Sequence, residues 1–159
     1  MVIQSQRGVS YVELMVYLLI VALLVIGGTL LSSKWIAQTQ LDRSIISFAS
    51  AVTLAKATSL KNETAQVDAE ITSMICYDDE AHMLTVHKSR EGKTADCDTP
   101  TVYKYDLSGS IEVLNPNNTT FKCFAFDAMG RLSNNSSECS SVGSVNVKNG
   151  DMQDAYSIN

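Results

Sequence analysis

The chain lacks charge over one long stretch, and it lacks the short motifs by which many enzymes are recognised. No charged residue lies between Leu14 and Ser33. No glycine-rich phosphate loop follows a predicted strand, and no serine stands in a nucleophile-elbow sequence. A chain of 159 residues that contains a long helix has no room for a second, catalytic domain. We therefore expect a protein that is not an enzyme and that needs no cofactor.

Basic residues are scarce as well. The chain has 12 Lys and Arg against 17 Asp and Glu, which gives a formal net charge of −5 at pH 7. Binding to nucleic acid requires clustered cations that contact phosphates, and an acidic surface repels polyanions. We therefore do not expect nucleic acid among its partners.

The uncharged stretch is long enough to cross a bilayer, because about 20 helical residues rising ~1.5 Å each span a hydrocarbon core of roughly 30 Å. A secretory signal peptide is the competing interpretation, but its apolar region has about 7–15 residues and is followed by small residues. Here Lys34, Trp35 and Ile36 follow instead. Arg7, the only basic residue before the stretch, favours a cytoplasmic N-terminus. The sequence predicts one membrane span, with the rest of the chain outside the cytoplasm.

Glu13 stands at the start of this apolar run. A carboxylate within a span costs about 2.5–3.5 kcal/mol on insertion scales. One interpretation is that Glu13 reaches interfacial water. Its neighbours favour another, because Gly8 stands five residues before Glu13 in "QRGVSYVELMV". This segment resembles the processing site of type IV prepilins, in which a short polar leader ends in Gly and is followed by four mostly apolar residues, Glu and a long apolar helix.

The resemblance implies cleavage between Gly8 and Val9 by a prepilin peptidase, and methylation of the new amine. Val9 departs from the Phe or Met that is usual there. If Glu13 of an incoming subunit meets the Val9 amine of a subunit in a filament, the two unpaired charges favour docking in one register. The alternative is a pair within one chain, since the two residues are four apart on one helix face.

The pattern becomes amphipathic beyond the apolar run. Apolar residues then recur at three- and four-residue spacing, at Leu41, Ile45, Phe48, Ala49, Val52 and Ala55. We expect one helix from about Val9 to Leu60. Lys61-Asn62 is its predicted end, because Asn tolerates the left-handed conformation that terminates helices.

Short β-like runs follow the helix: Gln66–Cys76, Met83–His87, Thr101–Tyr105, Ile111–Leu114, Phe121–Phe126 and Ser144–Val147. "DLSG" at 106–109 predicts a hairpin turn between the third and fourth runs, and "NPNN" at 115–118 closes the fourth. No internal repeat or low-complexity linker divides the chain. We expect an α+β fold with four parts: a leader at 1–8, a membrane and filament-core helix at 9–33, its amphipathic continuation at 34–62, and a β-rich periplasmic head at 63–159 on which that continuation packs.

Two further segments carry a family resemblance. "FASAVTLAKATSLKNETAQV" at 48–67 and "FAFDAMGRLS" at 124–133 resemble the GspH/FimT group of minor pilins and pseudopilins, which includes FimU-like members. In the second segment Gly130 is expected to serve a turn after a strand, and Phe124 and Phe126 share one strand face and are expected to fill the core.

The resemblance implies a type IV pilin-like fold: a long helix packed on an antiparallel sheet. It also implies a single-pass precursor in the bacterial inner membrane that enters a type IV pilus and helps to prime or cap it. Its partners would be other minor and major pilins, the prepilin peptidase and the inner-membrane assembly platform. A type II secretion pseudopilin of the GspH type remains an alternative. A FimT-like DNA-binding competence pilin is a second one, but those relatives carry a Gly-Arg-x-Arg type motif, and "GRLS" supplies only Arg131.

Four cysteines lie beyond the predicted span: Cys76, Cys97, Cys123 and Cys139. In an oxidising compartment an even number of cysteines in a small domain indicates disulfides, with three connectivities open. We favour the pairs 76–97 and 123–139, because each brackets one loop-rich segment. A metal site that adds His82 and His87 to Cys76 and Cys97 fits no paired-cysteine zinc spacing, so we expect no metal and two solvated histidines on a β-hairpin.

Overall fold

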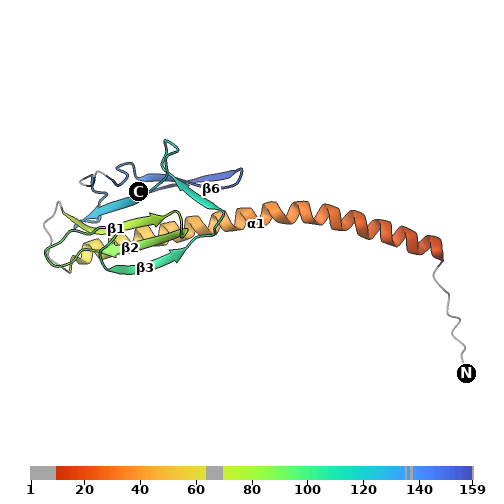
Figure 1. Cartoon of the computed structure of the whole chain (residues 1–159), viewed down its shortest axis with the longest axis horizontal. Helices are drawn as coiled ribbons and strands as arrows, with labels where there is room; N and C mark the ends of the chain where they lie inside the picture. The colour runs from red at the N-terminus through yellow and green to blue at the C-terminus, as the bar shows by residue number, and fades with distance from the viewer. Residues whose placement is uncertain (1–9, 64–69, 135, 137, 159) are drawn as a thin grey trace, which may run out of the picture. The chain divides into compact units, whose positions relative to one another are not determined.

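The computed structural model describes residues 10–63, 70–134, 136 and 138–158, with no side-chain surroundings for 27–31. Its elements, in chain order, are α1 (Tyr11–Lys61), β1 (Ile71–Asp78), β2 (Met83–Lys88), β3 (Thr101–Asp106), β4 (Ile111–Leu114), β5 (Cys123–Asp127), β6 (Ser144–Asn149) and β7 (Met152–Ser157) (Figure 1). The chain divides into two compact units, Met1–Ile36 and Ala37–Asn159. The first unit contains the N-terminal part of α1, and the second contains the rest of α1 and all seven of these strands.

Helix α1 begins at Tyr11 and ends where the local chemistry predicts, whereas Val9, its predicted start, lies outside the described residues. The backbone N–H of Leu14 donates to the carbonyl of Ser10 at 3.1 Å, which closes the first turn. Glu13 lies in this turn, where the positive end of the helix dipole stabilises a carboxylate. The helix ends at Lys61, and Asn62 follows in the left-handed region with φ 36°. The predicted C-terminal signal at Lys61-Asn62 is therefore confirmed.

Two antiparallel sheets form the head. One has the order β3-β2-β1-β5 and the other the order β4-β6-β7. The α+β class with an antiparallel sheet is thus confirmed, and β4 has the predicted bounds. Residues 66–69 of the first predicted strand lie outside the described residues. Strand β7 was not predicted, because its residues, "MQDAYS", alternate only weakly between apolar and polar.

The predicted hairpin between the third and fourth strands is wrong. A turn is present, but it lies two residues later than predicted, because the N–H of Ile111 donates to the carbonyl of Ser108 at 2.9 Å, and Gly109 does not adopt the expected positive φ. However, β3 pairs with β2, and β4 pairs with β6. The turn therefore carries the chain from one sheet to the other. Turn residues specify a local bend, but the pairing of the strands on either side depends on which strand edges are free in the folded head.

Residues of α1 from Leu41 onward supply the centre of the core. Phe48 is fully buried, and its ring contacts Phe121, Phe124 and Tyr156 with centroid distances of 5.6, 6.2 and 5.7 Å. The core includes buried residues of both sheets and of the helix: Leu41, Phe48, Ala51, Val52, Ala55, Ile75, Tyr77, Leu84, Val86, Leu107, Ile111, Val113, Phe121, Phe124, Phe126, Val145 and Val147. The amphipathic pattern therefore identified the face of the helix that packs on the sheets.

Strand β1 is covered on both faces. Ile75 and Tyr77 belong to the core shared with α1, whereas Met74 and Cys76 belong to a second, smaller apolar cluster with Cys123, Ala125 and others. Successive side chains of a strand point to opposite faces, so this second cluster lies on the face of the sheet that is turned away from the helix.

In the part of the chain that the structure describes, no helix is both long enough and apolar enough to cross a membrane. The side chains at 27–31, which belong to the predicted span, are not among those described.

Candidate functional site

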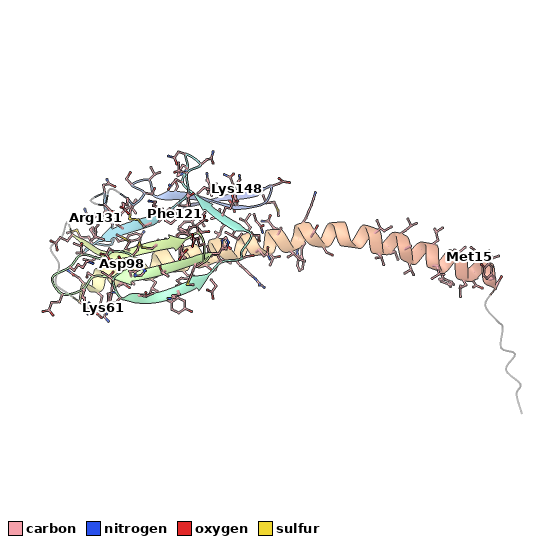
Figure 2. The ribbon with its side chains drawn as sticks, viewed as in Figure 1. Met15, Lys61, Asp98, Phe121, Arg131 and Lys148 are labelled. Atoms are coloured by element: carbon pink, nitrogen blue, oxygen red, sulfur yellow. A yellow bond between two sulfur atoms is a disulfide. The ribbon has the colours of Figure 1, made fainter. Side chains whose placement is uncertain are left out.

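The first unit presents a helical surface that is apolar all round. Every side chain of α1 from Tyr11 to Ile26 is exposed. The exposed fraction is 46% for Ile20 and 70% for Leu24, and Met15 marks this part of the helix in Figure 2. Monomeric soluble proteins rarely expose contiguous apolar patches larger than a few hundred Å², and helices that are apolar all round are normally buried. This exposed apolar surface is therefore the candidate site of the first unit.

Glu13 interrupts that surface near its N-terminal end. Its side chain is exposed, and it forms no ion pair with any other described residue. Gly8 and Val9 lie outside the described residues. Cleavage between them, methylation, and pairing of Glu13 with the Val9 amine therefore stay predictions.

A polar clamp lies at the start of the second unit. The side-chain amide of Asn149 donates to the carbonyl of Ala37 at 3.0 Å and to Oε1 of Gln40 at 3.1 Å. The hydroxyl of Ser110 donates to the same Gln40 oxygen at 3.2 Å. Asn149 is 7% exposed. These bonds tie α1 to the β6–β7 hairpin and to the residue before β4.

Sequence reasoning missed Asn149, although a signal was present. Asn149-Gly150 is a dipeptide typical of hairpin turns, and Gly150 adopts φ 60° between β6 and β7. Reading this signal would have predicted both the missing strand β7 and the position of Asn149.

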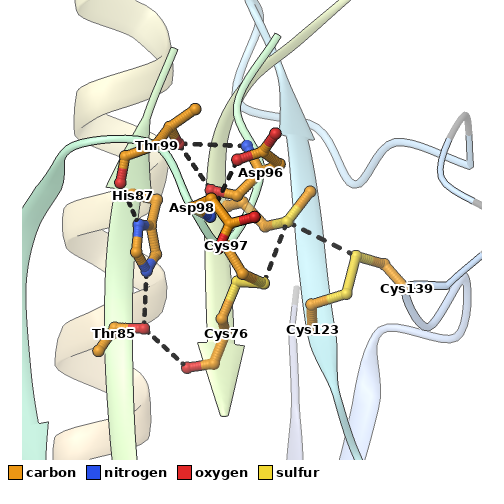
Figure 3. The surroundings of a disulfide bond; sticks show 10 residues. Cys76, Thr85, His87, Asp96, Cys97, Asp98, Thr99, Cys123 and Cys139 are labelled. Atoms are coloured by element: carbon orange, nitrogen blue, oxygen red, sulfur yellow. Dashed lines mark hydrogen bonds between the residues drawn. A yellow bond between two sulfur atoms is a disulfide. The ribbon is translucent and has the colours of Figure 1, made fainter. Parts of the chain in front are cut away.

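The two favoured disulfides are confirmed. Cys76 bonds to Cys97, and Cys123 bonds to Cys139 (Figure 3). The first tethers the segment between β2 and β3 to β1, and the second tethers the segment between β5 and β6 to β5. These bonds are expected to stabilise a head of modest size. For closed loops of about 15–20 residues, the loss of chain entropy in the unfolded state corresponds to a stabilisation of roughly 3 kcal/mol per disulfide.

The expectation of two solvated histidines is wrong for His87. His87 is 5% exposed, its Nδ1 donates to the carbonyl of Thr99 at 2.7 Å, and its Nε2 lies 2.8 Å from Oγ1 of Thr85. The segment that Cys97 tethers covers the ring, which the local sequence could not indicate. Among the described residues, no group of three His, Cys, Asp or Glu side chains could hold a metal ion.

Gly130 serves the predicted turn after β5. It adopts φ 74°, and its N–H donates to the carbonyl of Asp127 at 3.0 Å. The carboxylate of Asp127 accepts from the N–H groups of Met129 and Arg131, each at 2.9 Å. Phe124 and Phe126 are fully buried in the core as expected. Arg131 itself is exposed at the end of the turn.

A hollow of about 420 Å³ lies where α1 ends, beside β2 and β3. Glu63 bridges two lysines there, at 2.8 Å from Lys61 and 2.7 Å from Lys88. Its hydrogen bonds with Lys61 and then Lys88 lower the pKa of its carboxyl group to about 2. The three charges neutralise one another in part, and all three side chains are open to solvent.

The described residues thus offer an apolar helical surface with one acid near its start, joined to a head that two disulfides stabilise. Comparison of the chain with models of protein families, with curated proteins and with solved structures found no match.

Proposed function

We propose that this protein is a minor subunit of a type IV pilus, which enters the filament by the N-terminal half of α1 and helps to prime or cap its assembly. The observation that carries the proposal is the exposed apolar surface of α1 from Tyr11 to Ile26. A surface of this kind fits two successive surroundings: the hydrocarbon of the inner membrane before assembly, and the apolar helices of neighbouring subunits afterwards.

The prepilin-like segment around Gly8 supplies the chemistry of assembly. Cleavage after Gly8 places a positive amine on Val9. An amine and a carboxylate that are each unpaired in apolar surroundings are costly, and pairing them removes much of that cost. Glu13 of one subunit and Val9 of its neighbour therefore favour a single axial register between subunits. In this proposal Glu13 has a role in assembly rather than in catalysis.

The head supports the same proposal. Its core takes residues of α1 from Leu41 onward and of both sheets, and the backbone of the same helix continues from Tyr11 to Lys61. The segment that would enter the filament is therefore covalently continuous with the helix on which the head is built. The two disulfides suit a periplasmic location, because such bonds persist in oxidising compartments.

The test is the substitution Glu13→Ala in a piliated bacterial host that produces the full chain. We expect the variant to be processed normally but to be depleted from sheared filaments, as measured by immunoblotting. Glu112→Ala is the matched control, because it removes the same charge from an exposed position of the head. Equal amounts of both variants in filaments would refute the pairing of Glu13.

A second measurement tests processing. Mass spectrometry of the protein from membranes should find a chain that begins at Val9, and Gly8→Ala should leave the precursor uncut. A mature protein that retains its first eight residues would overturn the proposal. Recovery of the processed chain with a secretion apparatus instead of pili would favour the type II pseudopilin.

A further inference from the structure

The four cysteines form one cluster rather than two separate bridges. Sδ of Met74 lies 3.8 Å from Sγ of Cys97 and 3.9 Å from Sγ of Cys139. Met74 therefore has one sulfur of each disulfide beside it. It is 5% exposed, and it belongs to the small apolar cluster on the face of the sheet that is turned away from α1.

Cys76 and Cys123 face each other directly across β1 and β5. The N–H of Tyr77 donates to the carbonyl of Lys122 at 2.8 Å, whereas the carbonyl of Cys123 turns away from β1 and accepts from Ser140 at 2.9 Å. Hydrogen-bonded and non-hydrogen-bonded pairs alternate along an antiparallel ladder. The pair 76/123 is therefore of the non-hydrogen-bonded kind.

Residues in a non-hydrogen-bonded pair have Cα atoms about 4.5 Å apart and side chains on the same face. That separation lies within the range of roughly 4.4–6.8 Å that disulfides span. Cys76 and Cys123 are therefore placed to bond to each other without movement of either strand, although each bonds to another partner in the oxidised protein.

Burial distinguishes the two inner sulfurs, those of Cys76 and Cys123, from the two outer sulfurs, those of Cys97 and Cys139. Cys76 is 6% exposed and Cys123 is 4% exposed, whereas Cys97 is exposed and Cys139 is half-buried. An open hollow of about 640 Å³ is lined by Cys76, Cys97 and Cys123. Cys97 is the most exposed of the four cysteines and lines this hollow, so a small thiol reaches its sulfur first, and attack on that sulfur releases Cys76 as the thiolate.

We propose that the two disulfides form a single thiol–disulfide exchange unit, which responds to one equivalent of a dithiol by forming a Cys76–Cys123 bond. A thiolate of the dithiol attacks Sγ of Cys97, forms a mixed disulfide and releases the thiolate of Cys76. That thiolate attacks Sγ of Cys123, forms the Cys76–Cys123 bond and releases the thiolate of Cys139. The second thiol of the reagent then attacks the reagent's other sulfur in the mixed disulfide and releases the thiolate of Cys97. The dithiol ends as a cyclic disulfide, and Cys97 and Cys139 end as thiols.

Exchange of this kind changes the tethering of the head without separating β1 from β5. The segment between β2 and β3 and the segment between β5 and β6 both lose their covalent anchors. The central strand pair gains one. A two-electron reduction thus releases two surface segments together, rather than one.

Limited reduction of the unaltered, full-length oxidised protein tests this directly. The protein receives one equivalent of dithiothreitol, is quenched with acid and N-ethylmaleimide, and is digested for mass spectrometry. The main species with one remaining disulfide should contain the Cys76–Cys123 crosslink, with Cys97 and Cys139 alkylated. If that species instead retains Cys76–Cys97 or Cys123–Cys139, the proposal is overturned.

A pair of variants provides an independent check. Cys97→Ala/Cys139→Ala removes both outer sulfurs, and the purified protein should contain a Cys76–Cys123 disulfide and no free thiol. Cys76→Ala/Cys97→Ala is the matched control, because it also loses two cysteines but keeps the Cys123–Cys139 bond. Two free thiols in the first variant, in a protein with the circular dichroism of the control, would contradict the proposed geometry.

Discussion

Phe48→Ala offers the sharpest test of how the head is held together, because one helical side chain contacts elements of both sheets. Its ring meets Phe124 of β5 and Tyr156 of β7, and also Phe121, which precedes β5. Truncation of a fully buried Phe costs about 3–5 kcal/mol through lost transfer free energy and the cavity left behind. Each aromatic pair adds about 0.5–1.5 kcal/mol beyond its buried area, so the upper end of that range is expected.

Such a loss is large beside the whole free energy of unfolding, which is about 5–15 kcal/mol for a typical domain. Urea unfolding of the full chain in mild detergent, followed by far-ultraviolet circular dichroism, measures it. Ile46→Ala on the same helix is the matched control, because Ile46 is 65% exposed, and changes at exposed positions usually stay within about 0.5 kcal/mol. A loss below about 1 kcal/mol for Phe48→Ala, or equal losses for the two variants, would refute the role of Phe48 as the centre of the core.

Three further predictions concern the clamp, the ion pairs and the surface charge. Asn149→Ala should lower the free energy of unfolding by about 1–3 kcal/mol, because it removes hydrogen bonds and leaves the Gln40 side chain with one donor fewer; a change within error would contradict this. Because its lysine partners lower the pKa of Glu63 from 4.5 to about 2, the stability that Glu63 contributes is present above about pH 4.5 and is lost as the pH falls towards 2. Glu63→Gln should therefore remove part of the acid sensitivity in that window, and an unchanged pH profile would argue against these ion pairs. A gel shift with duplex DNA at physiological salt should be negative, and a salt-sensitive shift that Arg131→Ala abolishes would revive the DNA-binding alternative.

Local sequence signals were sufficient for the helix and for much of the second half. The amphipathic repeat identified Leu41, Phe48, Val52 and Ala55 as buried. Asn62 and Gly130 adopt positive φ where their residue types predict it. These predictions succeed because helix periodicity and turn conformation depend on residues that lie only a few positions apart in the sequence. A short window of sequence therefore contains the interactions that determine them.

The disulfide pairing was also predictable, but its surroundings were not. Each cysteine bonds to its neighbour in the sequence, and the separations are 21 and 16 residues. The proximity of Cys76 to Cys123 arises from the antiparallel pairing of β1 with β5. Along the chain, these two strands are separated by β2, β3 and β4. No short window contains that information.

The amino-acid order alone decided that an apolar, nearly uncharged run would begin a long helix, that a β-rich head would follow, and that four cysteines would lie in that head. Periodicity and turn chemistry act over a few residues and need no knowledge of the rest of the chain. Only the tertiary structure decided that β3 and β4 belong to different sheets and that His87 is buried. The same holds for the hydrogen bond from Asn149 to Ala37 of the helix, and for the position of Met74 beside both disulfides. Each of these features depends on which distant segments of the chain pair with a given strand edge or pack on a given face of the sheet. The packing of the whole head determines those contacts.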